Sequence, residues 1–181
     1  MTPTHTPGRL AIPPLPTVLD AFNLAPADEA RPLLLDCLGS LRWAERVLAH
    51  RPYPTVDALL AAADEAAYDL TASDLSEALA AETLPTLPDG IYSAAHMALD
   101  AAHAAYESRF GHAFVICLDG LPADEALDHV LAGIRSRLTN DPEDERVVAA
   151  EELRRTARGR LVSSLRGAGS AANGPQPAPG A

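Results

Sequence analysis

Residues 140–165 read NDPEDERVVAAEELRRTARGRLVSSL and have the spacing of one long amphipathic helix. The turn Asn140-Asp141-Pro142 predicts its start, because proline is favoured in the first turn of a helix. Apolar residues then recur at steps of three and four, which places them on one face: Val147, Ala150, Leu153, Ala157, Leu161 and Leu165. A stripe of this kind is buried against other elements, so the stretch predicts a helical core.

Arg160 belongs to the same helix and is the polar residue that departs from this pattern. At about 100° per residue it falls roughly 20° from Leu153 and points towards the stripe. A guanidinium directed at a core needs an anionic partner, since an unpaired buried charge is costly. Either an internal carboxylate or a bound anionic ligand would serve. The third alternative is an arginine at the edge of the stripe whose head reaches solvent.

Signals for helix starts and ends recur throughout the rest of the chain. They predict helices from Pro26 to Gly39, from Ser40 to before Pro52, from Thr55 to Leu70, from Thr71 to about Ala81, from Ser93 to Phe110 and from Pro122 onward. Residues 82–90 are predicted to form a loop, and residues 114–117 are an apolar run that we expect to be extended or simply buried. The fold class is therefore all-α, a single-domain bundle of about seven or eight helices.

Both ends of the chain have a composition that cannot bury much apolar surface. Residues 1–16 are rich in Pro and Thr, and residues 167–181 in Gly, Ala and Pro. We expect two disordered tails around a domain at residues 17–166.

Composition excludes several classes of function. The chain has 181 residues, 48% of them apolar, and a net charge of −11. This charge argues against nucleic acid and anionic membranes as partners, because both need clustered basic residues. There is no apolar run of membrane-spanning length and no export signal, so a cytoplasmic protein is expected. Cys37 and Cys117 are accordingly expected to be two buried thiols that do not form a disulfide.

Four polar residues fall within one sector of the predicted helix at residues 93–110. His96, Asp100, His103 and Glu107 are spaced so that they share a face. Imidazole and carboxylate groups could together bind a divalent transition metal. One helix rarely supplies four ligands, however, and no partner motif such as HExxH is present. A polar face with His–carboxylate pairs is the alternative, and we predict no metal site.

Several blocks in a fixed order resemble a known family. They are FNLAPADEARPLLLDCLGS at 22–40, RWAERVLAHRPY at 42–53, YESRFGHAFVIC at 106–117 and RSRLTNDPEDERVVAAEELRRTARGRL at 135–161. The combination is similar to the 2-oxo-4-hydroxy-4-carboxy-5-ureidoimidazoline (OHCU) decarboxylases, which are lyases that complete the conversion of urate to allantoin. The last block is similar to the family ending RLxNDxxxExxxAxxExxKIxxxRL. The resemblance covers about residues 20–165 and implies an enzyme without a cofactor.

The resemblance also implies where a catalytic pair would lie, and here the chain departs from the family. The family's acid/base histidine, in a His-Pro motif, matches Glu82. The glutamate of the family motif SxxEQ matches His96. An exchange of the two groups would preserve an acid/base pair, provided that burial let Glu82 hold a proton at neutral pH. Loss of activity is the other interpretation.

The remaining site residues implied by the resemblance would bind the substrate. Met97 matches the glutamine of SxxEQ, and His103 matches a family asparagine. In the family, the backbone of an apolar run contacts the ligand, and this run matches Phe114, Val115 and Ile116. An arginine near the end of the family's last helix faces an anionic group of the substrate, and it matches Arg160. The implied ligand is a small urate-derived heterocycle, and the implied assembly is a homodimer.

These observations leave three hypotheses for function. The first is an OHCU decarboxylase-like protein of urate and purine catabolism, forming (S)-allantoin, with its activity lost or altered. The second is a non-catalytic relative that binds a ligand or a partner through the same pocket. The third is a metal-binding helical protein.

Overall fold

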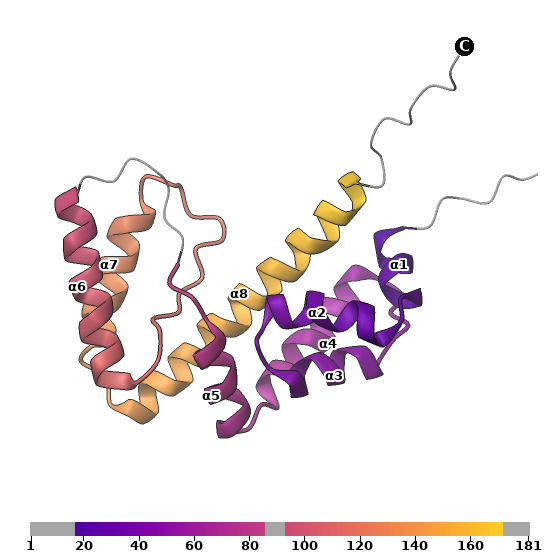
Figure 1. Ribbon diagram of the computed structural model, residues 1–181, viewed down its shortest axis with the longest axis horizontal. Coiled ribbons are helices and arrows are strands. Elements are labelled where there is room, and N and C mark those ends of the chain that lie inside the picture. Colours follow the sequence, from indigo (N-terminus) through magenta and orange to yellow (C-terminus); the bar gives the residue numbers. More distant parts are fainter. Residues whose placement is uncertain (1–16, 86–92, 172–181) are drawn as a thin grey trace, which may run out of the picture.

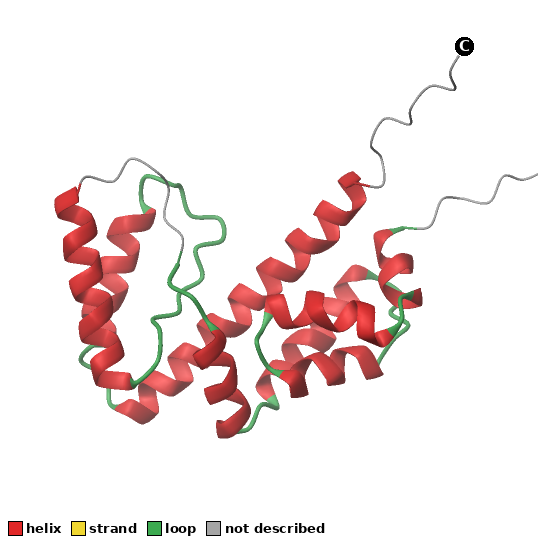
Figure 2. Ribbon diagram, viewed as in Figure 1, coloured by secondary structure: helices red, strands yellow, loops and turns green. Residues whose placement is uncertain are grey.

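The structure is a computed structural model that describes residues 17–85 and 93–171, with side chains described at 17–85 and 97–166. This part of the chain consists of helices and loops and contains no strand (Figure 2). The helices are α1 (Val18–Leu24), α2 (Ala27–Cys37), α3 (Leu41–Ala49), α4 (Val56–Tyr68), α5 (Ala72–Ala81), α6 (Ser93–Phe110), α7 (Ala126–Arg137) and α8 (Pro142–Ala171). The predicted all-α fold is confirmed.

Hydroxyl side chains begin three of these helices where the sequence predicts a start. Ser40, Thr55 and Thr71 each accept a hydrogen bond from the backbone N–H three residues later. At Thr71 the exchange is reciprocal, because Asp74 accepts from the backbone N–H of Thr71 at 2.9 Å. A cap of this kind stabilises a helix by about 1 kcal/mol, which explains why these starts can be located from local sequence.

Helix α1 was not predicted from the sequence, although it begins with the same device. Thr17 and Asp20 form a reciprocal capping box at its start. The helix has 7 residues and buries Phe22. A helix of this length is too short to show a clear apolar period, so it depends on tertiary packing.

The turn that follows α3 is fixed to the end of α1 by hydrogen bonds. Arg51 Nη1 donates to the carbonyl oxygens of Phe22 at 2.7 Å and Ala25 at 2.8 Å. Asn23 and Tyr53 exchange two bonds: the Asn23 amide donates to the Tyr53 carbonyl, and the Tyr53 backbone N–H donates to Asn23 Oδ1. The residues of the FN and RPY motifs therefore maintain the fold rather than a site.

Helix α8 crosses the molecule between two groups of helices (Figure 1). On one side it contacts α1, α2 and α4, and the larger part of the core lies there. Leu34, Trp43, Leu59, Leu153 and Leu161 are each at most 1% exposed. The Trp43 indole donates to the carbonyl oxygen of Ala63 at 2.8 Å, so this large side chain is buried without an unpaired polar group.

The second, smaller core lies where α6 packs against α7 (Figure 1). Its buried members are Leu99, Tyr106, Phe114, Val130 and Ile134. The rings of Tyr106 and Phe114 meet edge to face, with their centroids 4.9 Å apart. In the apolar run at 114–117, Phe114 and Val115 are buried, Ile116 and Cys117 are half-buried, and no strand forms.

Three details differ from the sequence prediction. Helix α7 begins at Ala126 rather than Pro122, because residues 122–125 form a turn closed by the bond from Glu125 N–H to the Pro122 carbonyl. Helix α8 continues to Ala171, past the expected end at Leu165. Val147 is 68% exposed, because it borders a solvent-accessible hollow between α8 and α5 rather than the larger core.

The two cysteines of the chain are unpaired, as the sequence predicts, but Cys117 is half-buried rather than buried, because its segment borders a cavity. Cys37 is buried in the larger core, and desolvation raises the pKa of its thiol. None of the described helices combines the length and the hydropathy that a bilayer crossing requires.

Candidate functional site

The candidate site begins with a close contact between the α2–α3 turn and the end of α5. A Cβ atom added at Gly39 would lie 2.5 Å from the Cβ of Ala81, closer than two such atoms can approach. Glycine at this position therefore lets the last turn of α5 rest directly on the α2–α3 turn. The next residue, Glu82, ends α5 and is carried towards α8.

Glu82 and Arg160 form a two-point ion pair at this place. Arg160 Nη1 donates to Glu82 Oε1 at 2.7 Å, and Nη2 donates to Oε2 at 2.8 Å. Nη1 also donates to the backbone carbonyl of Cys37 at 3.2 Å. The Glu82 side chain is 5% exposed and that of Arg160 is 37% exposed. The hydrogen bonds from Arg160 to Glu82 raise the pKa of the guanidinium, against the opposing effect of desolvation.

Arg160 therefore points towards the core side of α8, as its helical angle predicts. Of the three alternatives that the sequence left open, the structure shows the internal carboxylate, which is supplied by Glu82. Sequence reasoning proposed both residues for the site but did not pair them with each other.

The ion pair forms part of the wall of a cavity of about 290 Å³. The end of α5, the segment at 114–119 and one face of α8 enclose it. Its lining residues are Glu82, Thr83, Leu84, Pro85, Phe114, Val115, Ile116, Cys117, Leu118, Asp119, Thr156, Gly159, Arg160 and Ser163. Five residues predicted for the site thus meet around one space.

Thr156 and Asp119 also border this cavity, and the sequence did not single them out. The Thr156 hydroxyl is buried and has no hydrogen-bond partner among the described residues. A Cβ added at Gly159 would lie 1.7 Å from Oδ2 of Asp119, so the absence of a side chain there lets this carboxylate lie against α8. Their place at a cavity depends on how the segment at 114–119 packs on α8, which local sequence does not reveal.

Met97 and His103 lie outside the cavity lining. Met97 is 71% exposed on α6. His103 is 5% exposed and packs near Phe114, with ring centroids 6.3 Å apart. Helix α6 is turned so that Leu99, His103 and Tyr106 face the smaller core. The side chain of His96 lies outside the described residues, so the pairing of Glu82 with His96 stays a prediction.

The same orientation of α6 separates the residues of the possible metal face. His103 is buried, whereas Asp100 and Glu107 are exposed. Among the residues whose side chains are described, there is no group of three or more metal-binding side chains. Desolvation lowers the pKa of His103, opposed in part by the charge of Asp100.

A buried polar network holds the segment that lines the cavity. Arg137 donates to the carbonyl of Val115 at 2.6 Å and, through Nε, to Glu145 at 2.8 Å. Tyr106 donates its hydroxyl proton to the same carboxylate, which contributes, after desolvation, to raising the pKa of the phenol. The Arg137 guanidinium also lies 4.5 Å from the centre of the Phe114 ring. Arg137 and Glu145 belong to the quoted RLxNDxxxE block, so this motif could have indicated the buried network from the sequence.

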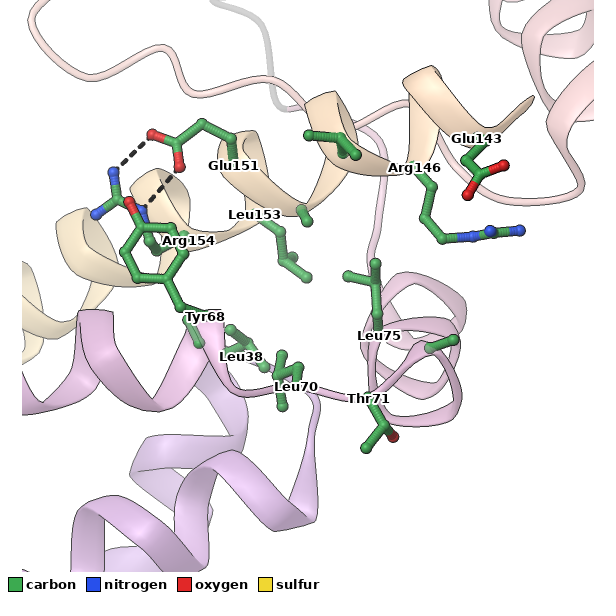
Figure 3. A pocket seen from close by; sticks show the side chains of 14 residues that line it. Leu38, Tyr68, Leu70, Thr71, Leu75, Glu143, Arg146, Glu151, Leu153 and Arg154 are labelled. Atoms are coloured by element: carbon green, nitrogen blue, oxygen red, sulfur yellow. Dashed lines mark hydrogen bonds and ion pairs between the residues drawn. The ribbon is translucent and has the colours of Figure 1, made fainter. Parts of the chain in front are cut away.

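A second cavity of about 370 Å³ lies between the end of α4, the start of α5 and α8 (Figure 3). Leu38, Leu70, Leu75 and Leu153 give it an apolar lining. At one end, Arg154 is bound at two points to Glu151 and lies over the ring of Tyr68 (Figure 3).

The apolar lining alone would favour this second cavity, because ligand sites are commonly lined by apolar side chains. None of the unpaired buried polar atoms found in the described residues lies in it. We therefore place the candidate site in the cavity at Glu82 and Arg160, where an unpaired hydroxyl and a charged pair converge.

Comparison with known proteins agrees with the family resemblance found in the sequence. Residues 23–87 and 90–162 match the family model described as OHCU decarboxylase. A search of curated proteins found no match to this chain. The crystal structure of an OHCU decarboxylase in the presence of (S)-allantoin is similar with a TM-score of 0.65 and 19% identity, covering 78% of this chain and 99% of that one.

The crystal structure of an (S)-allantoin synthase is also similar, with a TM-score of 0.62 and 25% identity. The match covers 81% of this chain and 53% of that chain, so this protein spans about half of the synthase structure. The OHCU decarboxylase match extends over most of the described residues, including Glu82, Arg160 and the segment between them in space. By its sequence and its fold, this chain belongs to the OHCU decarboxylase family.

Proposed function

We propose that this protein binds a small heterocycle of urate breakdown in the cavity at Glu82 and Arg160, and decarboxylates OHCU slowly or not at all. Membership of the OHCU decarboxylase family supports a function related to urate catabolism. One neighbour of similar fold is an OHCU decarboxylase whose structure was determined in the presence of (S)-allantoin. The observation that carries the proposal is the two-point bond between Glu82 and Arg160.

This pair limits what Glu82 can do as an acid. Decarboxylation breaks a carbon–carbon bond, releases CO₂ and leaves a carbanion that must receive a proton. Both carboxylate oxygens of Glu82 already accept hydrogen bonds from Arg160, so a proton on either oxygen would displace one of them. Glu82 is therefore a poor replacement for the histidine that the family has at this position.

The pair also limits what Arg160 can do as a binding group. The family resemblance implies that this arginine binds an anionic group of the substrate. Here the protein supplies the anion itself, from a side chain that is 5% exposed. A carboxylated substrate would have to displace Glu82 and leave that carboxylate without its partner, which is costly at a buried position.

The test is turnover of OHCU generated freshly from urate, followed by circular dichroism of the (S)-allantoin formed. We expect a rate lower than that of an active family member by about 10²–10⁴-fold, the contribution typical of a general acid–base group. Glu82→His should increase the rate at least tenfold, because it returns an imidazole and releases Arg160. Glu151→Gln is the matched control, since it removes a carboxylate from an ion pair elsewhere on α8, where Arg154 keeps its pair with Asp64, and should leave the rate unchanged.

Fast turnover by the unaltered protein would contradict the proposal. If Glu82→Gln and His96→Ala each abolished such turnover, the exchanged acid/base pair would be established instead.

A homodimer and a cytoplasmic location, both expected from the sequence, stay predictions. Light scattering after size-exclusion chromatography measures whether the protein is a dimer.

A further inference from the structure

We infer that the cavity at Glu82 and Arg160 selects an uncharged ureide, a molecule with a –NH–CO–NH– group, and discriminates against carboxylates. The inference rests on the proposed function, since it concerns the ligand of the same site. It assigns the selection to Glu82 and gives Thr156 a role in binding.

The first observation is the charge of the lining. Among the cavity-lining residues, Arg160 is the single basic group, and two carboxylates, Glu82 and Asp119, accompany it. A third carboxylate, brought by a ligand, would meet two negative charges and a guanidinium that is already paired. The cavity is therefore built against an anion, although it contains an arginine.

The second observation is the set of hydrogen-bonding groups that remain available. Nη1 of Arg160 is bonded to both Glu82 and Cys37, whereas Nη2 is bonded to Glu82 alone, which leaves N–H donors for one carbonyl oxygen. The carboxylates of Glu82 and Asp119 can accept N–H groups from a ligand. A ureide presents both kinds of group side by side.

The third observation is the hydroxyl of Thr156. It is buried, borders the cavity and lacks a partner among the described residues. Thr156 precedes Arg160 by one helical turn on α8, so the two side chains share a face. A buried hydroxyl without a partner reduces stability, and a ligand that donates to it or accepts from it removes this penalty.

The segment at 114–119, which faces α8 across the cavity, also has main-chain groups without a hydrogen-bond partner in the part of the chain that the structure describes. Ile116 takes part in no hydrogen bond among the described residues, through either its N–H or its carbonyl. Its neighbours Val115 and Cys117 are each engaged, by Arg137 and Glu152 respectively. The amide of Ile116 is thus held in place at the cavity by bonds on both sides of it.

The experiment compares two probes by isothermal titration calorimetry: hydantoin, an uncharged cyclic ureide, and hydantoin-5-acetate, which adds one carboxylate. We expect the unaltered protein to bind hydantoin at least tenfold more tightly. Glu82→Gln should remove or reverse this preference, because Arg160 then lacks its internal anion. Glu151→Gln, which removes a carboxylate from an ion pair of α8 outside this cavity, should retain it.

Thr156→Val separates a role in binding from a role in the fold. The change preserves shape and removes the unpaired hydroxyl, so the melting temperature should stay the same or rise while hydantoin affinity falls several-fold. A clear drop in melting temperature would show that the hydroxyl is structural and would overturn its assignment.

The remaining outcomes are decisive in different ways. Tighter binding of hydantoin-5-acetate by the unaltered protein overturns the selection but retains the ligand site of the proposed function. Failure of both probes to bind at millimolar concentration overturns both. A preference for methylguanidine over hydantoin would show that the cavity selects a cation, and would also overturn the inference.

Discussion

Two of the arginine–glutamate pairs that involve α8 have different surroundings. In the first, Arg137 and Glu145 have side chains that are 8% and 0% exposed, and Tyr106, Asn140 and the Val115 carbonyl complete the network. In the second, Glu82 is almost as buried, but Arg160 is 37% exposed and the pair borders a cavity.

The difference separates a structural pair from a pair that can exchange partners. Every acceptor around Arg137 belongs to the protein, and the guanidinium is enclosed by the rings of Phe114 and Tyr106. Around Arg160, water and small molecules can reach the guanidinium, and an unpaired hydroxyl lies one turn away. The same chemistry therefore fixes a loop at one place and forms a binding surface at the other.

The largest expected effect comes from Glu145→Gln. It leaves the buried charge of Arg137 without a counter-charge, and breaking a buried pair in this way costs about 3–5 kcal/mol in free energy of unfolding. Urea denaturation measures the change. Arg155→Ala breaks an exposed pair with Glu152 and serves as the control, with a loss of at most about 1 kcal/mol. Equal losses in free energy of unfolding for the two variants would show that the network at Glu145 stabilises the fold no more than an exposed ion pair does.

Gly39→Ala is expected to be the next in size. Its new methyl group would lie 2.5 Å from the Cβ of Ala81, and overpacking of this kind costs about 1–3 kcal/mol. Because α5 must then move, the pair between Glu82 and Arg160 should weaken, whereas Arg137 and Glu145 should be unaffected.

The double variant Gly39→Ala/Ala81→Gly tests that mechanism. Removing the Ala81 methyl group restores the space, so its melting temperature should lie above that of Gly39→Ala alone. If the double variant were the less stable of the two, the close approach of α5 would not be the cause.

We predict that the free energy of unfolding depends on pH through His103, which lies near the buried network. Its pKa in the folded protein is lowered by desolvation, while a histidine in the unfolded chain titrates near 6.5. The unfolded state thus binds the proton more readily, and stability is lost as the pH falls below about 6.5, by at most about 1.4 kcal/mol per pH unit.

The measurement is the free energy of unfolding between pH 7.5 and 5.5, compared with that of His103→Leu. We expect the variant to show a shallower loss on acidification, because it lacks the group that must be protonated. Parallel curves for the two proteins would exclude His103 as the source.

Glu82→Gln is expected to have the smallest effect on stability. Arg160 keeps its bond to the Cys37 carbonyl and reaches solvent, so the free energy of unfolding should fall by about 1 kcal/mol or less. Compared with Glu145→Gln, this gives the sharpest contrast between the two pairs. A loss of several kcal/mol at Glu82 would make that pair structural as well.

Much of the site could be predicted because the OHCU decarboxylase likeness and the helical period agree on Arg160. The likeness also indicated Glu82 and residues 114–116, which line the cavity. Met97 and His103 were placed in the site by position in a motif, yet α6 directs His103 into the smaller core and leaves Met97 exposed. A motif match fixes a position along the chain, but the rotation of a helix depends on what it packs against.

The sequence by itself determined the helices whose ends carry capping residues, since Ser40, Thr55 and Thr71 act through bonds three residues away. It also determined the all-α fold and the inward direction of Arg160, which follow from periodicity. Only the tertiary structure decided that Arg160 meets Glu82, 78 residues away along the chain. It likewise decided that Thr156 borders a cavity without a partner, because contacts between distant segments depend on packing rather than on local sequence.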